Sequence, residues 1–152
     1  NDKYWKAVLS YDLENKFKKY FKNENIAIQG ELIGEGIQGN KYKLSGHHIY
    51  FFNILYIQKR IYGNIECLKY VCNLLDINIV PILNEHYILT NDIPSLVELS
   101  KGNSELYPNS PREGIVIRPL QEIEDFEFRD KLVKNRISFK SINPEFLLKY
   151  GI

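Results

Sequence analysis

A length of 152 residues suits a single domain that buries a hydrophobic core, and it gives no indication of a second domain. The 20 lysine and arginine residues and the 19 acidic residues leave a formal net charge of +1, so no overall positive field of the kind that attracts nucleic acid is present. No apolar run reaches the ~18 residues that a membrane helix needs, and we expect a cytoplasmic protein without membrane contact.

Cysteine and methionine usage add two expectations. Cys67 and Cys72 lie five residues apart, with no Cys-x-x-Cys pair and no histidine cluster nearby. This spacing favours free, buried thiols over a disulfide or a zinc site. Methionine is absent from every position, including the first, so we expect the 152 residues to be part of a longer or processed chain.

The first third of the chain predicts a helix and two strands. Apolar residues recur at intervals of three and four from Lys3 to Phe21, which predicts one amphipathic helix whose aromatic stripe packs into the core. The members of the stripe are Trp5, Val8, Leu9, Leu13, Phe17 and Tyr20. Alternating residues from Ile26 to Ile33 and an aromatic run from Ile49 to Ile57 predict two antiparallel strands.

The middle of the chain predicts two further helices. Asn64 is a candidate cap for a helix from Ile65 to Leu75, and Asp92 is a candidate cap for a helix that carries Leu96 on its apolar face. Between them, the run from Ile79 to Leu83 predicts a short strand closed by proline. Residues 101–111 are rich in glycine, asparagine, serine and proline, which is typical of an exposed loop.

The last third predicts two strands and a helix. The strands run from Gly114 to Leu120 and from Ile137 to Ile142, and Asn143 caps a final helix. The segment between the strands is acidic, and we expect its carboxylates to lie in solvent. They are Glu122, Glu124, Asp125, Glu127 and Asp130. Because helices and strands do not alternate regularly, the order favours an α+β fold with mainly antiparallel sheets flanked by helices.

Two glutamates stand beside glycines at the edges of apolar strands. Glu31 follows Gly30 and Glu113 precedes Gly114, so backbone can approach a ligand closely while the acid holds a sugar hydroxyl or a metal-bound water. Taken alone, such a residue is more often a solvated turn residue. A carboxylate pair is also compatible with acid and base catalysis of glycoside hydrolysis.

Three further side chains make a nucleotide site the preferred interpretation. Phe51 or Phe52 could stack on a purine, and because neighbouring side chains on a strand point to opposite faces, only one can do so. We select Phe52. Lys140 and Arg118 supply cations for phosphates, Glu31 suits a ribose or metal-water role, and Glu113 suits a metal ligand.

In its ordered motifs, the chain resembles the covalent nucleotidyltransferase superfamily of ATP-dependent DNA ligases, RNA ligases and mRNA capping enzymes, and most closely an RNA ligase family. The motifs are Tyr4-Trp-Lys, Ile26-Ala-Ile-Gln-Gly-Glu-Leu-Ile-Gly, Asn40-Lys-Tyr-Lys-Leu, Tyr50-Phe-Phe-Asn-Ile, Glu113-Gly-Ile-Val-Ile-Arg-Pro, Ser138-Phe-Lys-Ser-Ile and Phe146-Leu-Leu-Lys. Each motif alone is weak, whereas the ordered set is fairly specific. The resemblance implies part of an ATP-grasp-like nucleotidyltransferase domain that occupies residues 1–152.

The resemblance also implies an activity. Such ligases use ATP with magnesium or manganese to adenylate a lysine, transfer the AMP to an RNA 5′-phosphate, and seal it to a 3′-hydroxyl, as in RNA repair. By this likeness Glu31, Phe52, Glu113, Arg118 and Lys140 bind the nucleotide, and Glu113 also binds the metal. The implied partners are ATP and nicked or broken RNA, with no stable protein partner.

The chain departs from the family pattern at three places. Ser138 stands where the fifth motif commonly has the first of two lysines, and Asn53 stands where the aromatic motif often has aspartate. The nucleophilic motif Lys-x-Asp/Glu-Gly is missing from the 152 residues. We therefore expect a fragment that is inactive alone and lacks an upstream lysine segment and an accessory domain. A non-catalytic nucleotide- or RNA-binding module, a DNA ligase and a capping guanylyltransferase remain alternatives.

Overall fold

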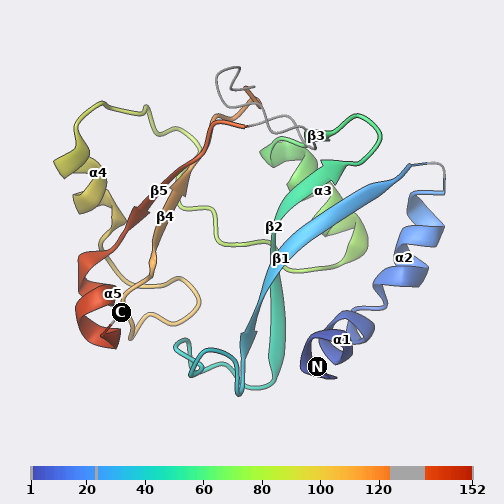
Figure 1. The fold of residues 1–152 in the computed structure, drawn as a ribbon, viewed down its shortest axis with the longest axis horizontal. Helices are drawn as coiled ribbons and strands as arrows, with labels where there is room; N and C mark the ends of the chain where they lie inside the picture. The colour runs from blue at the N-terminus through green and yellow to red at the C-terminus, as the bar shows by residue number, and fades with distance from the viewer. Residues whose placement is uncertain (1, 23, 124–135, 152) are drawn as a thin grey trace.

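The chain folds into two lobes that lie side by side (Figure 1). The computed structural model describes residues 2–22, 24–123 and 136–151. The first lobe, within residues 2–75, carries a three-stranded sheet with helices α1 to α3, and the second lobe, within residues 93–150, carries a two-stranded sheet with α4 and α5. Every named strand pair is antiparallel, so the prediction of an α+β fold with mainly antiparallel sheets is confirmed.

The start of the chain forms two helices, α1 (Asp2–Ser10) and α2 (Leu13–Tyr20), so the prediction of one continuous helix is wrong. Asp12 adopts a left-handed conformation with φ of 50°, which interrupts the helical backbone and changes its direction (Figure 1). Phe17 still packs against the core, but Trp5 is 63% exposed and Tyr20 is 40% exposed. The aromatic stripe is therefore only partly buried, because the two helices do not share one face.

The first sheet has the order β1 (Ile26–Gly34), β2 (His47–Tyr56) and β3 (Ile61–Tyr62). Its register shifts between Gln29 and Gly30, which pair with Asn53 and Phe51 and leave Phe52 as the extra residue of a bulge. A side chain at Gly30 would meet Ile49 and Phe51 at less than 3 Å, so this close approach of the strands requires glycine.

Helix α3 (Ile65–Leu75) has the predicted bounds, and it covers this sheet. The Asn64 side chain accepts a hydrogen bond from the backbone N–H of Cys67 at 2.9 Å, which is the predicted cap. Leu68 and Leu75 pack with Phe51 and other residues of β1 and β2 in the main core. Both cysteines are free thiols, as expected, with Cys72 buried and Cys67 half-buried.

The segment from Ile79 to Leu83 does not form the predicted strand. Ile79 alone makes a bridge, parallel to Phe51, and the chain then crosses toward the second lobe. Pro81 has no backbone N–H to donate, which prevents continued pairing at that position. No helix among the described residues has the length and apolar character that a membrane crossing needs.

The second lobe contains α4 (Ile93–Ser100), β4 (Gly114–Ile117), β5 (Phe139–Ile142) and α5 (Pro144–Tyr150). Both strands are shorter than predicted, and Pro119 lies just beyond β4. Asn143 is fully buried and caps α5 by accepting a hydrogen bond from Glu145 N at 3.0 Å, as predicted. Asp92 makes no side-chain hydrogen bond to the backbone of α4, and its carboxylate instead accepts one from the Ser95 hydroxyl.

The acidic segment between β4 and β5 is only partly described. Glu124, Asp125, Glu127 and Asp130 lie outside the described residues. Glu122 is described, and its side chain is 21% exposed and paired with Arg136. The expectation of a solvated carboxylate is therefore wrong at Glu122, because a neighbouring guanidinium compensates its charge.

Candidate functional site

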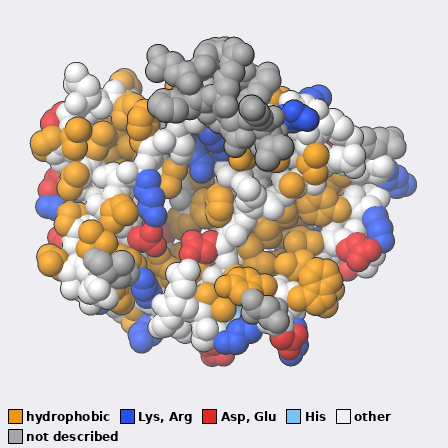
Figure 2. Space-filling view, in the orientation of Figure 1, with side chains coloured by type: hydrophobic (Ala, Val, Ile, Leu, Met, Phe, Trp, Pro, Cys, Tyr) orange, Lys and Arg blue, Asp and Glu red, His pale blue; other side chains and the backbone are white. Residues whose placement is uncertain are grey.

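Charged side chains from both lobes meet at a hollow on one face of the molecule (Figure 2). Glu31 from β1 and Glu113 from the start of β4 line the same small depression, together with Lys41 and Tyr42 of the loop after β1. Its enclosed volume of ≈ 10 Å³ is about that of one water molecule, so a larger ligand must lie over the open face. The hollow therefore forms an open surface site between the lobes.

Glu113 and Lys140 form an ion pair at the second-lobe side of the hollow. Lys140 lies on β5 opposite Val116 of β4, and its Nζ donates to Glu113 Oε1 at 2.7 Å. The two side chains are 54% and 42% exposed for Lys140 and Glu113, respectively. Exposed pairs of this kind contribute at most about 1 kcal/mol, so the pair can open at little cost when a ligand binds.

Carboxylates from the two lobes repel each other across the hollow. Partial burial and the nearby Glu113 carboxylate raise the pKa of Glu31, while Lys140 and Lys41 act in the opposite direction. Burial and the same two carboxylates raise the pKa of Tyr42 to about 12. The phenol is therefore neutral at physiological pH, and the local negative potential would be relieved by a cation.

The residues at the hollow fit a hydrated divalent cation better than a closed protein cage. Within the part of the chain that the structure describes, no three acidic, cysteine or histidine side chains gather in a group that could hold a metal ion. Magnesium commonly binds one or two carboxylates and keeps several waters or phosphate oxygens as its other ligands. Glu113 and Glu31 together meet that requirement, and Glu113 is the residue we predicted for it.

Phe51 and Phe52 have opposite environments on β2. Phe51 is 3% exposed and belongs to the core, whereas Phe52 is half-buried and lies outside the core cluster. Glu31 pairs with Tyr50, and Phe52 is the unpaired residue of the bulge between Phe51 and Asn53, where the regular alternation of side chains is interrupted. Phe52 and Glu31 therefore lie on neighbouring strands of the first sheet, and neither belongs to its core.

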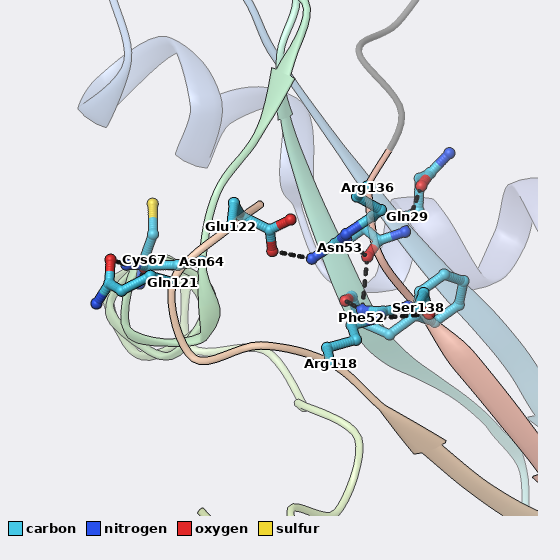
Figure 3. Close-up of polar contacts among 10 residues, drawn as sticks. All are labelled: Gln29, Phe52, Asn53, Asn64, Cys67, Arg118, Gln121, Glu122, Arg136 and Ser138. Carbon is cyan, nitrogen blue, oxygen red and sulfur yellow. Dashed lines mark hydrogen bonds and ion pairs between the residues drawn. The ribbon is translucent and has the colours of Figure 1, made fainter. Parts of the chain in front are cut away.

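Behind Phe52, a network of polar side chains joins the two lobes (Figure 3). Arg118 Nη1 donates to the Phe52 carbonyl at 3.0 Å and to Asn53 Oδ1 at 2.8 Å. Arg136 Nη1 donates to the same Asn53 oxygen at 2.6 Å. The Asn53 amide in turn donates to Gln29 Oε1 at 2.8 Å. We call Asn53, Arg118, Glu122 and Arg136 the arginine network.

Arg136 is the most enclosed member of the arginine network. Its Nη2 donates to the Glu122 carboxylate, and its guanidinium lies 4.6 Å from the ring centre of Tyr62. Its Nε is buried and has no partner among the described residues. Burial and the nearby charge of Arg136 also lower the pKa of Arg118. Two guanidiniums are thus held close together around one neutral amide.

A second contact joins the lobes through aromatic rings. The Lys41 ammonium lies 4.8 Å from the ring centre of Phe146 and 5.2 Å from that of Tyr150, both on α5. The Tyr150 hydroxyl donates to the Lys41 carbonyl at 3.4 Å. We call Lys41, Phe146 and Tyr150 the aromatic contact.

The structure brings the sequence candidates into two adjoining groups. Glu31, Glu113 and Lys140 meet at the hollow, whereas Arg118 is bonded to the backbone of Phe52 and to Asn53. Sequence reasoning assigned no site role to Arg136, Tyr42 or Lys41. Lys41 and Tyr42 lie inside a quoted motif, and Arg136 lies two residues before another, so closeness in sequence to the motifs was the signal that could have found them.

Comparison with known proteins places the chain in a family. The model of the family described as RNA ligase matches residues 1–140. Comparison with curated proteins gave no match. Naegleria gruberi RNA ligase with PPi has a similar structure, with a TM-score of 0.79 and 30% identity, over 97% of this chain and 40% of that one.

Two variants of the Naegleria gruberi enzyme are similar to the same degree. One, with ATP and Mn, matches with a TM-score of 0.79 and 31% identity over 95% of this chain. The other, with AMP and Mn, matches with a TM-score of 0.78 and 31% identity over 95% of this chain. In each case the match covers 40% of the Naegleria protein. The family match over most of the sequence and the shared nucleotidyltransferase architecture show that this chain belongs to the RNA ligase family.

Proposed function

We propose that this chain forms the nucleotide-binding part of an ATP-dependent RNA ligase. The observation that carries the proposal is the convergence of Glu31 from the first sheet with Glu113 and Lys140 from the second sheet at one open hollow. Phe52, on the strand paired with that of Glu31, lies outside the core. An aromatic surface, two carboxylates and a cation are the groups that a nucleoside triphosphate with its metal requires.

Each residue has a distinct proposed role. Phe52 stacks on the adenine, and Glu31 accepts a ribose hydroxyl or a metal-bound water. Glu113 would hold a metal-bound water, and Lys140, its present ion-pair partner, would bind the phosphates, with Arg118 as a second cation close to Phe52.

The proposed metal is magnesium or manganese. The fit rests on the pair Glu31 and Glu113, whose repulsion raises the pKa of Glu31 and would be relieved by a divalent cation. Related structures of the Naegleria enzyme contain Mn together with ATP or AMP, which supports a nucleotide and a divalent metal as joint ligands. A divalent cation there would supply charge neutralisation for the phosphates.

The full reaction needs a nucleophile from outside these residues. The chain spans 40% of the Naegleria proteins it matches, and it contains no Lys-x-Asp/Glu-Gly motif. We propose that the parent protein supplies this lysine, forms a lysyl-AMP and seals RNA 3′-hydroxyl and 5′-phosphate ends. The 152 residues alone bind the nucleotide but do not become adenylated.

Calorimetric titration with ATP, GTP and adenosine in the presence of Mn²⁺ tests the binding site. We expect Phe52→Ala to weaken the binding of ATP and of adenosine alike by about tenfold, because a base stack contributes about 1–3 kcal/mol. Lys140→Ala should weaken the binding of ATP and leave the binding of adenosine unchanged. Phe139→Ala is the matched control, since Phe139 is an exposed aromatic residue next to Lys140 that points to the other face of β5.

Equal effects of Phe52→Ala and Phe139→Ala on nucleotide binding would contradict the stacking role. GTP binding in preference to ATP would favour a capping-type enzyme.

Labelling with α-phosphate-labelled ATP tests the chemistry. A protein extended upstream should form a lysine-linked AMP and seal nicked RNA in preference to nicked DNA, while the 152 residues remain unlabelled. Labelling of the 152-residue chain itself would overturn the proposed need for an outside lysine.

A further inference from the structure

Positive charge is concentrated on α2 and the residues just after it. Residues 16–22 contain four lysines and no acidic residue, whereas the whole chain has a formal net charge of only +1. The four are Lys16, Lys18, Lys19 and Lys22. Three aromatic residues, Phe17, Tyr20 and Phe21, stand between them. Cations interspersed with aromatic rings are the groups with which proteins bind single-stranded nucleic acid.

The core takes only two of these three aromatic rings. Phe17 and Phe21 pack against the main core one helical turn apart, with their ring centres 5.6 Å from each other. Tyr20 lies outside the core cluster and is 40% exposed. The third ring is therefore accessible from solvent beside the lysines, and a base can stack on it without any loss of core packing.

Tyr20 lines an open cleft between α2 and the end of α3, with a volume of ≈ 270 Å³. Pockets for drug-sized ligands begin at about 300 Å³, so the cleft suits a single heterocycle rather than a whole nucleotide. Two lysines, Lys16 and Lys19, and two aspartates, Asp12 and Asp76, also line it. Because these charges balance, the cleft fits an uncharged base better than a phosphate, and the carboxylates can accept hydrogen bonds from the amino groups of a base.

The lysines around the cleft are available to phosphates because their present contacts are weak. Lys18 forms an exposed ion pair with Glu14 one turn earlier on α2. Lys19 lies 4.7 Å from the ring centre of Tyr20, and Lys16 Nζ donates to the Asp76 carbonyl at 3.4 Å. Exposed contacts of this kind stabilise a helix only slightly, so the ammonium groups can turn to phosphates that lie outside the cleft.

We propose that α2 forms a binding surface for single-stranded RNA, in which one base enters the cleft and stacks on Tyr20 while the lysines of residues 16–22 contact the neighbouring phosphates. The proposal rests on the proposed function, because it names the surface that holds the RNA strand away from its reacting ends. Figure 1 shows α2 on the side of the first lobe that is turned away from the second lobe, so this surface is separate from the hollow.

The test is the binding of a fluorescently labelled, single-stranded oligoribonucleotide with a 5′-hydroxyl to the 152-residue chain, followed by anisotropy without ATP or metal. Tyr20→Ala should weaken binding by about tenfold, because a base stack is lost. Tyr20→Phe keeps the ring and should bind within about twofold of the unchanged chain. Tyr4→Ala is the matched control, since Tyr4 is 54% exposed on α1 and does not line the cleft.

Salt dependence separates the lysines from the ring. For single strands, the logarithm of the binding constant falls with the logarithm of the salt concentration by about 0.7 for each phosphate contact. Lys19→Gln should therefore reduce this slope by about 0.7, whereas Tyr20→Ala should leave the slope unchanged. Lys59→Gln is the control for the loss of a charge, since Lys59 is exposed in the turn between β2 and β3 and should not change the slope.

Several results would overturn the proposal. They are the absence of binding by the unchanged chain up to about 100 µM, equal losses for Tyr20→Ala and Tyr4→Ala, and equal changes of slope for Lys19→Gln and Lys59→Gln. An oligoaspartate peptide with as many negative charges as the RNA tests charge alone. RNA should bind at least about tenfold more tightly than this peptide, and equal binding would overturn the stacking role. Should Tyr20→Ala fail to fold, the slope of Lys19→Gln decides.

Titration with ATP keeps this proposal apart from the proposed function. Tyr20→Ala should bind ATP as the unchanged chain does, and Phe52→Ala should bind the oligoribonucleotide as the unchanged chain does, because the two surfaces are separate. Loss of ATP binding in Tyr20→Ala would contradict that separation. RNA binding that depends on Tyr20 without any ATP binding would remove the proposed function and keep the RNA surface, whereas ATP binding without RNA binding would do the reverse.

Discussion

Two of the contacts that join the described parts of the lobes differ in chemistry, the arginine network near β3 and the aromatic contact between the loop after β1 and α5. The aromatic contact is built on Phe146, which is 1% exposed, and on ring faces that accept the Lys41 ammonium. The arginine network is built from directional hydrogen bonds to Asn53 and one charge pair. Lys41 of the aromatic contact lines the hollow that contains Glu31 and Glu113, whereas Arg118 of the arginine network bonds to the Phe52 carbonyl.

The difference indicates a division of roles. Apolar packing is strong and tolerant of small shifts, whereas a partly buried charge network is sensitive to geometry and to the presence of every partner. We infer that the aromatic contact mainly provides stability, and that the arginine network mainly sets charge and position beside Phe52. Three changes test this division and a fourth tests the charges of the hollow, from the largest expected effect to the smallest.

Phe146→Ala should have the largest effect on stability. Removing a fully buried phenylalanine costs about 3–5 kcal/mol, because apolar area and close packing are both lost. Urea unfolding followed by circular dichroism measures the change. Leu148→Ala on the same helix is the control, since Leu148 is 85% exposed and should change the free energy of unfolding by less than about 0.5 kcal/mol. Similar losses for both variants would contradict the role of Phe146.

Glu122→Gln should have the next largest effect and lower the free energy of unfolding by about 3 kcal/mol. The change leaves Arg136 without its carboxylate while its side chain is 13% exposed, and loss of one partner of a buried pair is costly. The loss should persist in 0.5 M salt because the pair is poorly accessible to ions. Glu98→Gln removes a more exposed pair with Lys101 and serves as the control. A salt-sensitive loss of the same size as the control would show that the network is an ordinary surface pair.

Lys41→Met should lower the free energy of unfolding by about 0.5–1 kcal/mol. The substitution keeps the unbranched stem but removes the ammonium that lies over the rings of Phe146 and Tyr150. Lys43→Met in the same loop is the control, because Lys43 is exposed. Chemical unfolding of both variants measures the difference. A loss as large as that of Phe146→Ala would mean that charge, not packing, stabilises the aromatic contact.

Glu31→Gln should produce a small effect that depends on pH. The pKa of Glu31 is raised from 4.5 in the folded protein, so the folded state binds its proton more tightly than the unfolded state does. The unchanged chain therefore loses stability relative to the variant as pH rises above 4.5, through the raised pKa. Unfolding free energies of both proteins between about pH 3.5 and 7 should diverge with rising pH. A difference that is constant or shrinks would contradict the repulsion between Glu31 and Glu113.

Local sequence patterns predicted most of the secondary structure around the hollow, but they missed the contacts between the lobes. The alternation expected along β2 indicated that only one of Phe51 and Phe52 packs into the core, and the structure shows that it is Phe51. The interruption at Asp12 was missed, since a left-handed residue leaves the apolar spacing on either side intact. Arg136 was not recognised as the partner of Asn53 and of Glu122, because these contacts join residues that are far apart in sequence.

The central claim is that Glu31 and Phe52 of one lobe and Glu113 and Lys140 of the other surround one nucleotide and its metal. Amide NMR spectra of the chain, recorded with ATP while Mn²⁺ replaces Mg²⁺, test it most directly, since manganese broadens the signals of nearby nuclei. The account predicts that the amides around all four residues broaden together, and only when ATP is present. Broadening confined to one lobe, or unchanged by ATP, would contradict it.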